Sequence, residues 1–221
     1  AGAKRDSQNL KILFTRMGYY VKLHENYNKT QTLTELKDIQ TNPQLCRYDS
    51  FVCFVLSHGK DDCSFYTMGS GETEELNIDD VRYHFTNSAC RYLKGKPKIF
   101  LFNFCRGNIK ENVNNVEQDF IPVQNSDAPQ DMLTLFASIK YFSAARDIQY
   151  GTIFVQAICK VFAEHAHNTE IIDLYRKLCK EMQSMGGTTA EQQSYCFKKY
   201  FYFYPINIEH YQEAINCNLE Y

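Results

Sequence analysis

Two short apolar segments, each ended by a reactive side chain and a glycine, constrain the fold of this chain more than any other feature. The first segment, residues 96–107, starts beside Pro97, reads KPKIFLFNFCRG and stops at Gly107. It is too short for a globular helix and is typical of a strand buried on both faces in a parallel sheet. We therefore expect Cys105 at the carboxyl end of a central strand, where chemistry collects in open α/β sheets.

The second segment, residues 50–57, is equally apolar and is followed by His58 and Gly59. One helix-length crossover separates the two segments, so we expect the two strands to be neighbours, with His58 and Cys105 side by side. A cysteine beside a histidine is suited to nucleophilic catalysis, because the imidazole favours the thiolate and can protonate a leaving amine. The pair alone also allows a structural role, as a buried thiol and a hydrogen-bonding histidine.

Composition narrows the class of protein. The chain has 221 residues, 44% of them apolar, and a net charge of −2, which suits one domain and gives no electrostatic reason to expect nucleic acid or an anionic membrane as partner. No apolar run approaches the ~20 residues of a membrane span. Nine cysteines at irregular spacing, without a Cys-x-x-Cys pair, indicate neither a zinc site nor a disulfide scaffold and favour a reduced, cytosolic environment. No metal and no cofactor are expected. Because it begins at Ala1, the chain is expected to be a processed product or a fragment.

Helical and extended patterns alternate along the chain, which favours an α/β sheet covered on both faces. The predicted helices span residues 6–17, 32–39, 76–85, 151–166 and 169–185. Besides the two segments above, the predicted strands span residues 19–23, 63–68 (in a surface hairpin), 132–137 and 195–204. The polar, Asn-rich and Pro-containing stretch 109–130 is the best candidate for a linker.

The motifs resemble those of the caspase family. Ser57-His58-Gly59 and the sequence NFCRG at 103–107 are similar to its signatures Ser-His-Gly and Gln-Ala-Cys-(Arg/Gln/Gly)-Gly, and the spacing 105 − 58 = 47 is close to the usual ~50. Residues 137–156 resemble the start of the small subunit, with GTIFVQ at 151–156 in place of Gly-Ser-x-Phe-Ile-Gln. The resemblance covers about residues 4–204 and implies a caspase-like three-layer α/β sandwich with a mostly parallel central sheet.

The resemblance also implies the organisation of the chain as one catalytic domain. A large-subunit-like part would span residues 1–110, an intersubunit linker 111–131, a small-subunit-like part 132–204 and an extension 205–221. Activation of such a zymogen would cut the linker after an aspartate, at Asp127 or less favourably at Asp119. The edge strand predicted at 195–204 would pair with a second copy or a related caspase.

Site residues follow from the same resemblance. Cys105 is the expected nucleophile, His58 the general acid, and the backbone amides of Gly59 and Cys105 the oxyanion hole. Substrates are expected to be proteins with aspartate before the scissile bond. The expected substrate-binding residues are Arg146, Asn103, Ala145 and Ser143.

The expected pocket departs from the family pattern. Asn103 stands in place of glutamine and Ala145 in place of tryptophan, while a second arginine and the first strand of the family have no counterpart in this chain. Two functions follow: a cysteine endopeptidase that cuts after aspartate in apoptotic or related signalling, or a weak or inactive decoy that dimerises with an active caspase. An unrelated doubly wound binding domain would leave both signatures unexplained.

Overall fold

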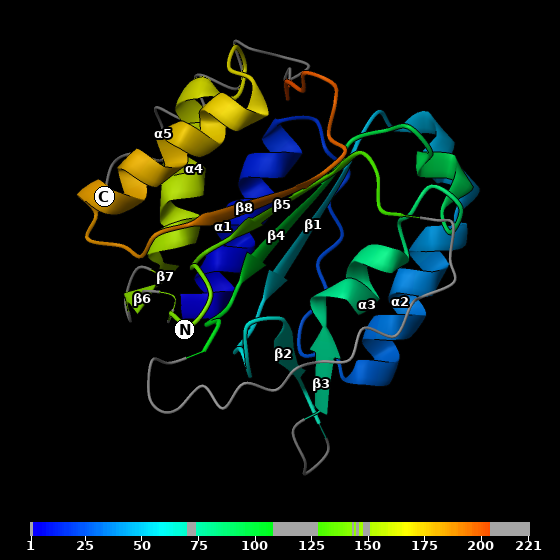
Figure 1. Ribbon diagram of the computed structural model, residues 1–221, viewed down its shortest axis with the longest axis horizontal. Helices are drawn as coiled ribbons and strands as arrows, with labels where there is room; N and C mark the ends of the chain where they lie inside the picture. The colour runs from blue at the N-terminus through cyan, green and yellow to red at the C-terminus, as the bar shows by residue number, and fades with distance from the viewer. Residues whose placement is uncertain are drawn as a thin grey trace.

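A four-stranded central sheet organises the protein (Figure 1). The computed structural model describes residues 2–69, 74–107, 128–142, 144, 146–147 and 151–203. The sheet comprises β1 (Phe51–Leu56), β4 (Lys98–Asn103), β5 (Met132–Phe136) and β8 (Glu191–Tyr195), in the order β1-β4-β5-β8. The first three strands are parallel and β8 is antiparallel to β5. The predicted mostly parallel α/β sheet is therefore confirmed.

Helices cover both faces of this sheet, which gives three layers (Figure 1). The first face packs against α1 (Gly2–Arg16), α4 (Ile153–His165) and α5 (Ile171–Ser184). The second face packs against α2 (Lys29–Thr41), α3 (Ile78–Tyr83) and the short 3-10 helices Pro43–Arg47 and Arg91–Leu93. Successive residues of β4 point to opposite faces, so Ile99 and Leu101 join the first apolar cluster and Phe100 and Phe102 the second.

Burial differs between the two strands that carry the site motifs. Every residue of β4 is buried, as predicted for a central strand. Every residue of β1 is only partly buried, because among the described residues no strand pairs with its outer edge. The expectation that both segments are fully buried is thus correct for β4 and wrong for β1.

A small hairpin follows β1, as predicted. It pairs β2 (Ser64–Thr67) with β3 (Glu74–Asn77) in antiparallel fashion. The helix predicted at 76–85 is shorter than expected, because its first residues belong to β3 and Asn77 is the N-cap of α3, accepting a hydrogen bond from the Asp79 amide. A second pair of two-residue strands, β6 (Arg146–Asp147) and β7 (Gly151–Thr152), precedes α4.

The strand predicted at 19–23 is wrong. This segment has no regular secondary structure, and its contacts are made by side chains instead. The Tyr19 hydroxyl lies 2.9 Å from the Ser50 Oγ, and Tyr19 and Val21 pack against the first apolar cluster. The alternation of apolar residues therefore reflects packing against the core and not pairing in the sheet.

The strand predicted at 195–204 is also wrong, since the edge strand is β8. Tyr195 pairs with Met132, the first residue of β5, so β5 offers no further residue for pairing beyond this point. Cys196 then adopts a left-handed conformation with φ 50°, which turns the chain away. Phe201 and Phe203 are buried in the first apolar cluster, so their alternation again reflects core packing.

Among the helices described, none is long and apolar enough to cross a membrane.

Candidate active site

The two sequence motifs meet at the carboxyl ends of neighbouring parallel strands. Leu56, the last residue of β1, pairs with Asn103, the last residue of β4, and the Ser57 amide donates to the Asn103 carbonyl at 3.3 Å. His58 and Cys105 each lie two positions beyond these paired residues. Their common register places both on the same edge of the sheet, as expected from the sequence.

Gly59 lies directly against Cys105. A Cβ atom added to Gly59 would lie 1.6 Å from the Cys105 carbonyl oxygen and 2.9 Å from the Phe104 ring. Only a glycine fits at such a distance, because no side chain can share this space with the neighbouring backbone. The glycine of the histidine motif is therefore what lets the two motifs come into contact.

The hairpin β2-β3 holds the histidine in place. The His58 carbonyl accepts from the Tyr66 amide at 2.8 Å, and the Ser57 hydroxyl donates to the Tyr66 carbonyl at 2.5 Å. Gly59 forms an antiparallel bridge to Phe65 of the same hairpin. The His58 side chain is exposed and Cys105 is partly buried, so both can be reached from solvent.

Arg106, the residue after Cys105, is buried with 1% of its surface exposed. Its Nε donates to the Asp62 carbonyl at 2.8 Å, its Nη1 lies 2.6 Å from a Glu191 carboxylate oxygen, and its guanidinium stacks 3.9 Å above the Phe136 ring. Its backbone amide and carbonyl bond to Phe142 and Tyr141. These contacts hold the turn that carries Cys105 in place. The sequence motif alone does not reveal them, because Arg106 matches a variable position of the family signature.

Asn103 takes part in a buried network instead of lying free in a pocket. Its Nδ2 donates to Thr152 Oγ1 at 2.8 Å, and Thr152 Oγ1 donates to Asp6 Oδ2 at 3.0 Å. The exposed fractions of Asp6, Asn103 and Thr152 are 1%, 4% and 3%. The Thr152 proton is committed to the carboxylate, so the Asn103 nitrogen must face Thr152. Within the part of the chain that the structure describes, Asn103 Oδ1 has no hydrogen-bond partner. No sequence signal pointed to Asp6, which reads as an ordinary helix residue.

The network also approaches another predicted substrate residue. Arg146 pairs with Thr152 in the β6-β7 ladder, so the backbone of Arg146 lies opposite the residue that binds Asn103. Ser143 and Ala145 lie outside the described residues, as do the predicted cleavage sites Asp119 and Asp127 and the segment 204–221. The backbone arrangement thus brings Asn103 and Arg146 to the same region.

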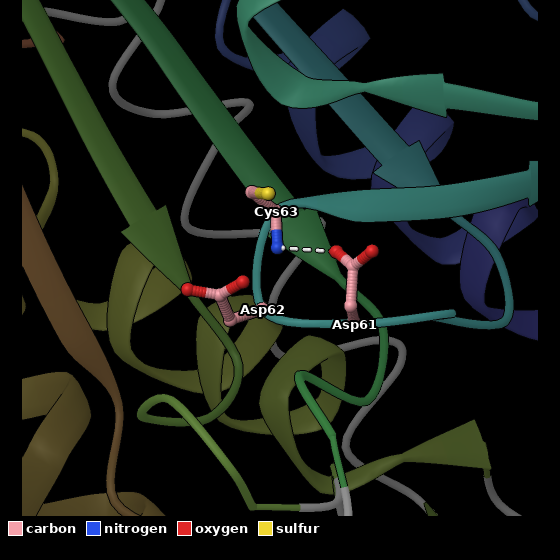
Figure 2. Close-up of side chains that lie close together, drawn as sticks. All are labelled: Asp61, Asp62 and Cys63. Carbon is pink, nitrogen blue, oxygen red and sulfur yellow. Dashed lines mark hydrogen bonds between the residues drawn. The ribbon is translucent and has the colours of Figure 1, made fainter. Parts of the chain in front are cut away.

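A group of possible metal ligands lies beside the site, on the loop before β2 (Figure 2). Ligand atoms of Asp61, Asp62 and Cys63 lie within 4.8 Å of one another. Asp61 Oδ1 already accepts from the amides of Cys63 and Ser64, at 2.9 and 2.7 Å. Asp62 pairs with Lys140 at 2.9 Å. Partial burial raises the pKa of Asp62, but the hydrogen bond and charge of Lys140, with a hydrogen bond to Cys63 and the charge of Arg106, together outweigh burial and lower that pKa. These carboxylates are therefore engaged in shaping the loop.

Comparisons with known proteins identify the family of the chain. The family model described as "Caspase domain" matches residues 1–202. Caspase Dronc of Drosophila melanogaster is 25% identical over 92% of this chain and 51% of its own length. Caspase-3 of Bos taurus is 26% identical over 86% of the chain and 70% of its own length, and caspase-1 of Mus musculus 26% over 80% and 48%. The chain thus spans about half the length of two of these relatives. It belongs to the caspase family.

Proposed function

We propose that this protein is a cysteine endopeptidase of the caspase type that cuts protein substrates after aspartate. The observation that carries this proposal is the contact between the two motifs, with His58 and Cys105 at the same register of neighbouring strands and Gly59 against Cys105. The arrangement suits acyl transfer, because nucleophile and proton donor face the same edge of the sheet.

In the proposed reaction the Cys105 thiolate attacks the scissile carbonyl carbon and forms a C–S bond. The backbone amides of Gly59 and Cys105 stabilise the resulting oxyanion, an interaction worth ~3 kcal/mol for each such donor. His58 protonates the leaving amine as the C–N bond breaks, and water then hydrolyses the thioester and restores the thiol. The reaction needs neither metal nor cofactor.

Recognition of the aspartate side chain is proposed for Arg146 and Asn103, and Ala145 and Ser143 are proposed as further substrate-binding residues. An arginine holds a carboxylate by charge-assisted, bidentate hydrogen bonds. In the described structure, however, the Asn103 nitrogen donates to Thr152. Arg146 would therefore carry most of the discrimination between aspartate and a neutral isostere.

The same observation supports a second candidate function. Because the Asn103 nitrogen already donates to Thr152, the pocket has one donor fewer for a substrate carboxylate. This favours a weak or inactive regulator that associates with an active relative. For the endopeptidase we propose a zymogen that acts in apoptotic or related proteolytic signalling. In either case we propose that the protein acts in the cytoplasm and forms a homodimer or a heterodimer with a related caspase. Because the edge strand is β8 and not residues 195–204, we place the proposed association at β8.

Covalent labelling separates the two candidates. The protein is incubated with an aspartyl peptide fluoromethyl ketone, and the adduct is measured by intact mass and mapped to a cysteine. The endopeptidase predicts one adduct on Cys105, lost in Cys105→Ala, and turnover at least ~100-fold slower in His58→Ala. The decoy predicts no adduct on Cys105 at high probe concentration.

Arg146→Ala tests the substrate class separately. A charge-assisted contact is worth about 1.5–3 kcal/mol, so this variant should lose at least tenfold of the preference for the aspartyl probe over its asparaginyl counterpart. Equal losses for both probes would assign Arg146 a role in the backbone structure instead.

A further inference from the structure

A chain of polar contacts connects the turn that carries Cys105, by way of β8, to helix α3. It starts at Arg106, whose Nη1 lies 2.6 Å from Glu191 Oε2. The other carboxylate oxygen of Glu191 accepts from Gln193 Nε2 at 2.9 Å. Gln193 Oε1 in turn accepts from Arg82 Nη1 at 3.1 Å. These contacts therefore link four residues without interruption: Arg106 in the turn after β4, Glu191 and Gln193 on β8, and Arg82 on α3.

The far end of this chain is anchored as firmly as the near end. Arg82 has 3% of its surface exposed although it carries a charge. Its Nε donates to Asp79 Oδ1 at 2.9 Å, its Nη1 lies 3.4 Å from Thr134 Oγ1 on β5, and its guanidinium lies 5.0 Å from the centre of the Tyr195 ring. A buried arginine with these partners has little freedom to move, because a guanidinium that left Asp79 would be a buried charge without a counter-ion.

Gln193 can lie in this chain in only one orientation. A carboxylate only accepts hydrogen bonds and a guanidinium only donates them. The amide nitrogen must therefore face Glu191 and the amide oxygen must face Arg82. Gln193 is thus an oriented link between two buried arginines, and its position fixes that of the Glu191 carboxylate.

The side chains of β8 that make these contacts all lie on one face of the strand. Residues 191, 193 and 195 share one face of the strand, because side chains alternate. In β8 that face carries a carboxylate, an amide and a tyrosine in place of aliphatic side chains. We propose that Gln193 and Arg82 are positioning residues for Cys105: they fix Glu191, which holds Arg106 and the turn next to the nucleophile.

This inference rests on the proposed role of Cys105, and its test begins with Gln193→Met. The substitution keeps the side-chain length and removes both hydrogen bonds, while each arginine keeps its carboxylate. Gln192→Met is the matched control, because Gln192 is the same residue type one position earlier, on the opposite face of β8. Coupling along a network of this kind changes a rate by roughly twofold to thirtyfold. We expect kcat for an aspartyl peptide to fall within that range in Gln193→Met, with KM nearly unchanged, and to stay at the wild-type level in Gln192→Met.

A double-mutant cycle tests whether the effect travels through Glu191. Gln193→Met and Glu191→Gln should be non-additive, so that the combined loss of kcat is smaller than the product of the two single losses. Arg82→Lys, which keeps the charge but cannot bridge Asp79 and Gln193 in the same geometry, should fall between wild type and Gln193→Met. A purely multiplicative cycle, or equal kcat values for Gln193→Met and Gln192→Met, would overturn the inference.

A second readout keeps the inference separate from the proposed function. The rate of Cys105 alkylation by iodoacetamide, measured by peptide mapping, reports the surroundings of the thiol whether or not the protein cleaves peptides. A changed rate in Gln193→Met but not in Gln192→Met supports the inference even if wild type shows no turnover. An unchanged rate in both variants, in protein with native thermal unfolding, contradicts it.

Discussion

At the residue scale, Gly59 leaves no room for a side chain beside the proposed nucleophile. Its added Cβ would lie 1.6 Å from the Cys105 carbonyl oxygen, so one of the two backbone segments must move in Gly59→Ala. A displacement of ~1 Å at a reacting group can cost about 100-fold in rate. We expect the rate of Cys105 labelling by the aspartyl probe to fall at least ~10-fold, as measured by intact mass.

Gly186→Ala is the control for this variant. A Cβ at Gly186 meets nothing within 4 Å, although φ of 70° strains the backbone. This change should lower the thermal unfolding temperature slightly and leave the labelling rate unchanged. If both alanine variants label Cys105 at the wild-type rate, the contact between the two motifs has no role in reactivity.

A second prediction at this scale concerns the cysteine thiols, because they differ in burial and therefore in pKa. Burial raises the pKa of Cys53 and of Cys159 to about 12, from an ordinary value of 9.0. The thiolate is the reactive form. At pH 8 iodoacetamide should therefore modify the exposed Cys46 and Cys196 and leave the other two intact, as shown by peptide mapping of the native protein.

The same pKa values predict how stability changes at alkaline pH. A thiol whose pKa is raised by folding contributes stability that is fully present below pH 9.0 and is lost as the pH rises toward about 12. The urea midpoint should fall over that window, and less steeply in Cys159→Ala. If Cys159 is modified as fast as Cys46 at pH 8, the Cys159 sulfur is accessible, and both the raised pKa and the predictions drawn from it are contradicted.

At the element scale, Thr152 joins α1, β4 and α4. Its Oγ1 contacts Asn103 and Asp6 and also accepts from the Val155 amide at 3.4 Å as the N-cap of α4. Removing it leaves buried polar groups without a partner, at about 1–3 kcal/mol each, besides the loss of the cap. We expect Thr152→Ala to lower the free energy of unfolding by roughly 2–4 kcal/mol in urea denaturation.

An exposed cap offers the comparison. Asn28 caps α2 through a hydrogen bond from the Gln31 amide at 2.8 Å, at the surface of the protein. Asn28→Ala should therefore cost only about 1 kcal/mol. Similar losses in the two variants would mean that the buried contacts of Thr152 add nothing to its capping role.

At the scale of the whole molecule, the proposed activation should cut the chain without separating its two parts. The part after the linker supplies β5, which pairs along its length with β4 of the first part, and α4 packs against α1. We expect cleavage after Asp127 to yield two fragments that stay together in native mass spectrometry and separate under denaturing conditions. Asp127→Ala should block this cut and Asp119→Ala should not; the reverse result would move the site to Asp119.

The sequence by itself determined the α/β class, the parallel central strands and the two motifs. The signals for these features are local: apolar runs of strand length, glycines at strand ends and polar residues at helix starts. Parallel strands that each end on a motif must present those motifs at one edge of the sheet. The placement of His58 and Cys105 at one edge of the sheet followed from that geometry without knowledge of any distant contact.

Only the tertiary structure decided which strands lie at the edges and which polar residues are buried. The polar strand Glu191–Tyr195 lacks the apolar alternation that marks a strand, because it is held by Arg82, Arg106 and its partner β5. Residues 19–23 and 195–204 carry that alternation but pack against the core outside the sheet. A pattern of apolar residues reports which side chains are buried, whereas strand pairing and the partners of a buried charge depend on residues far away in the chain.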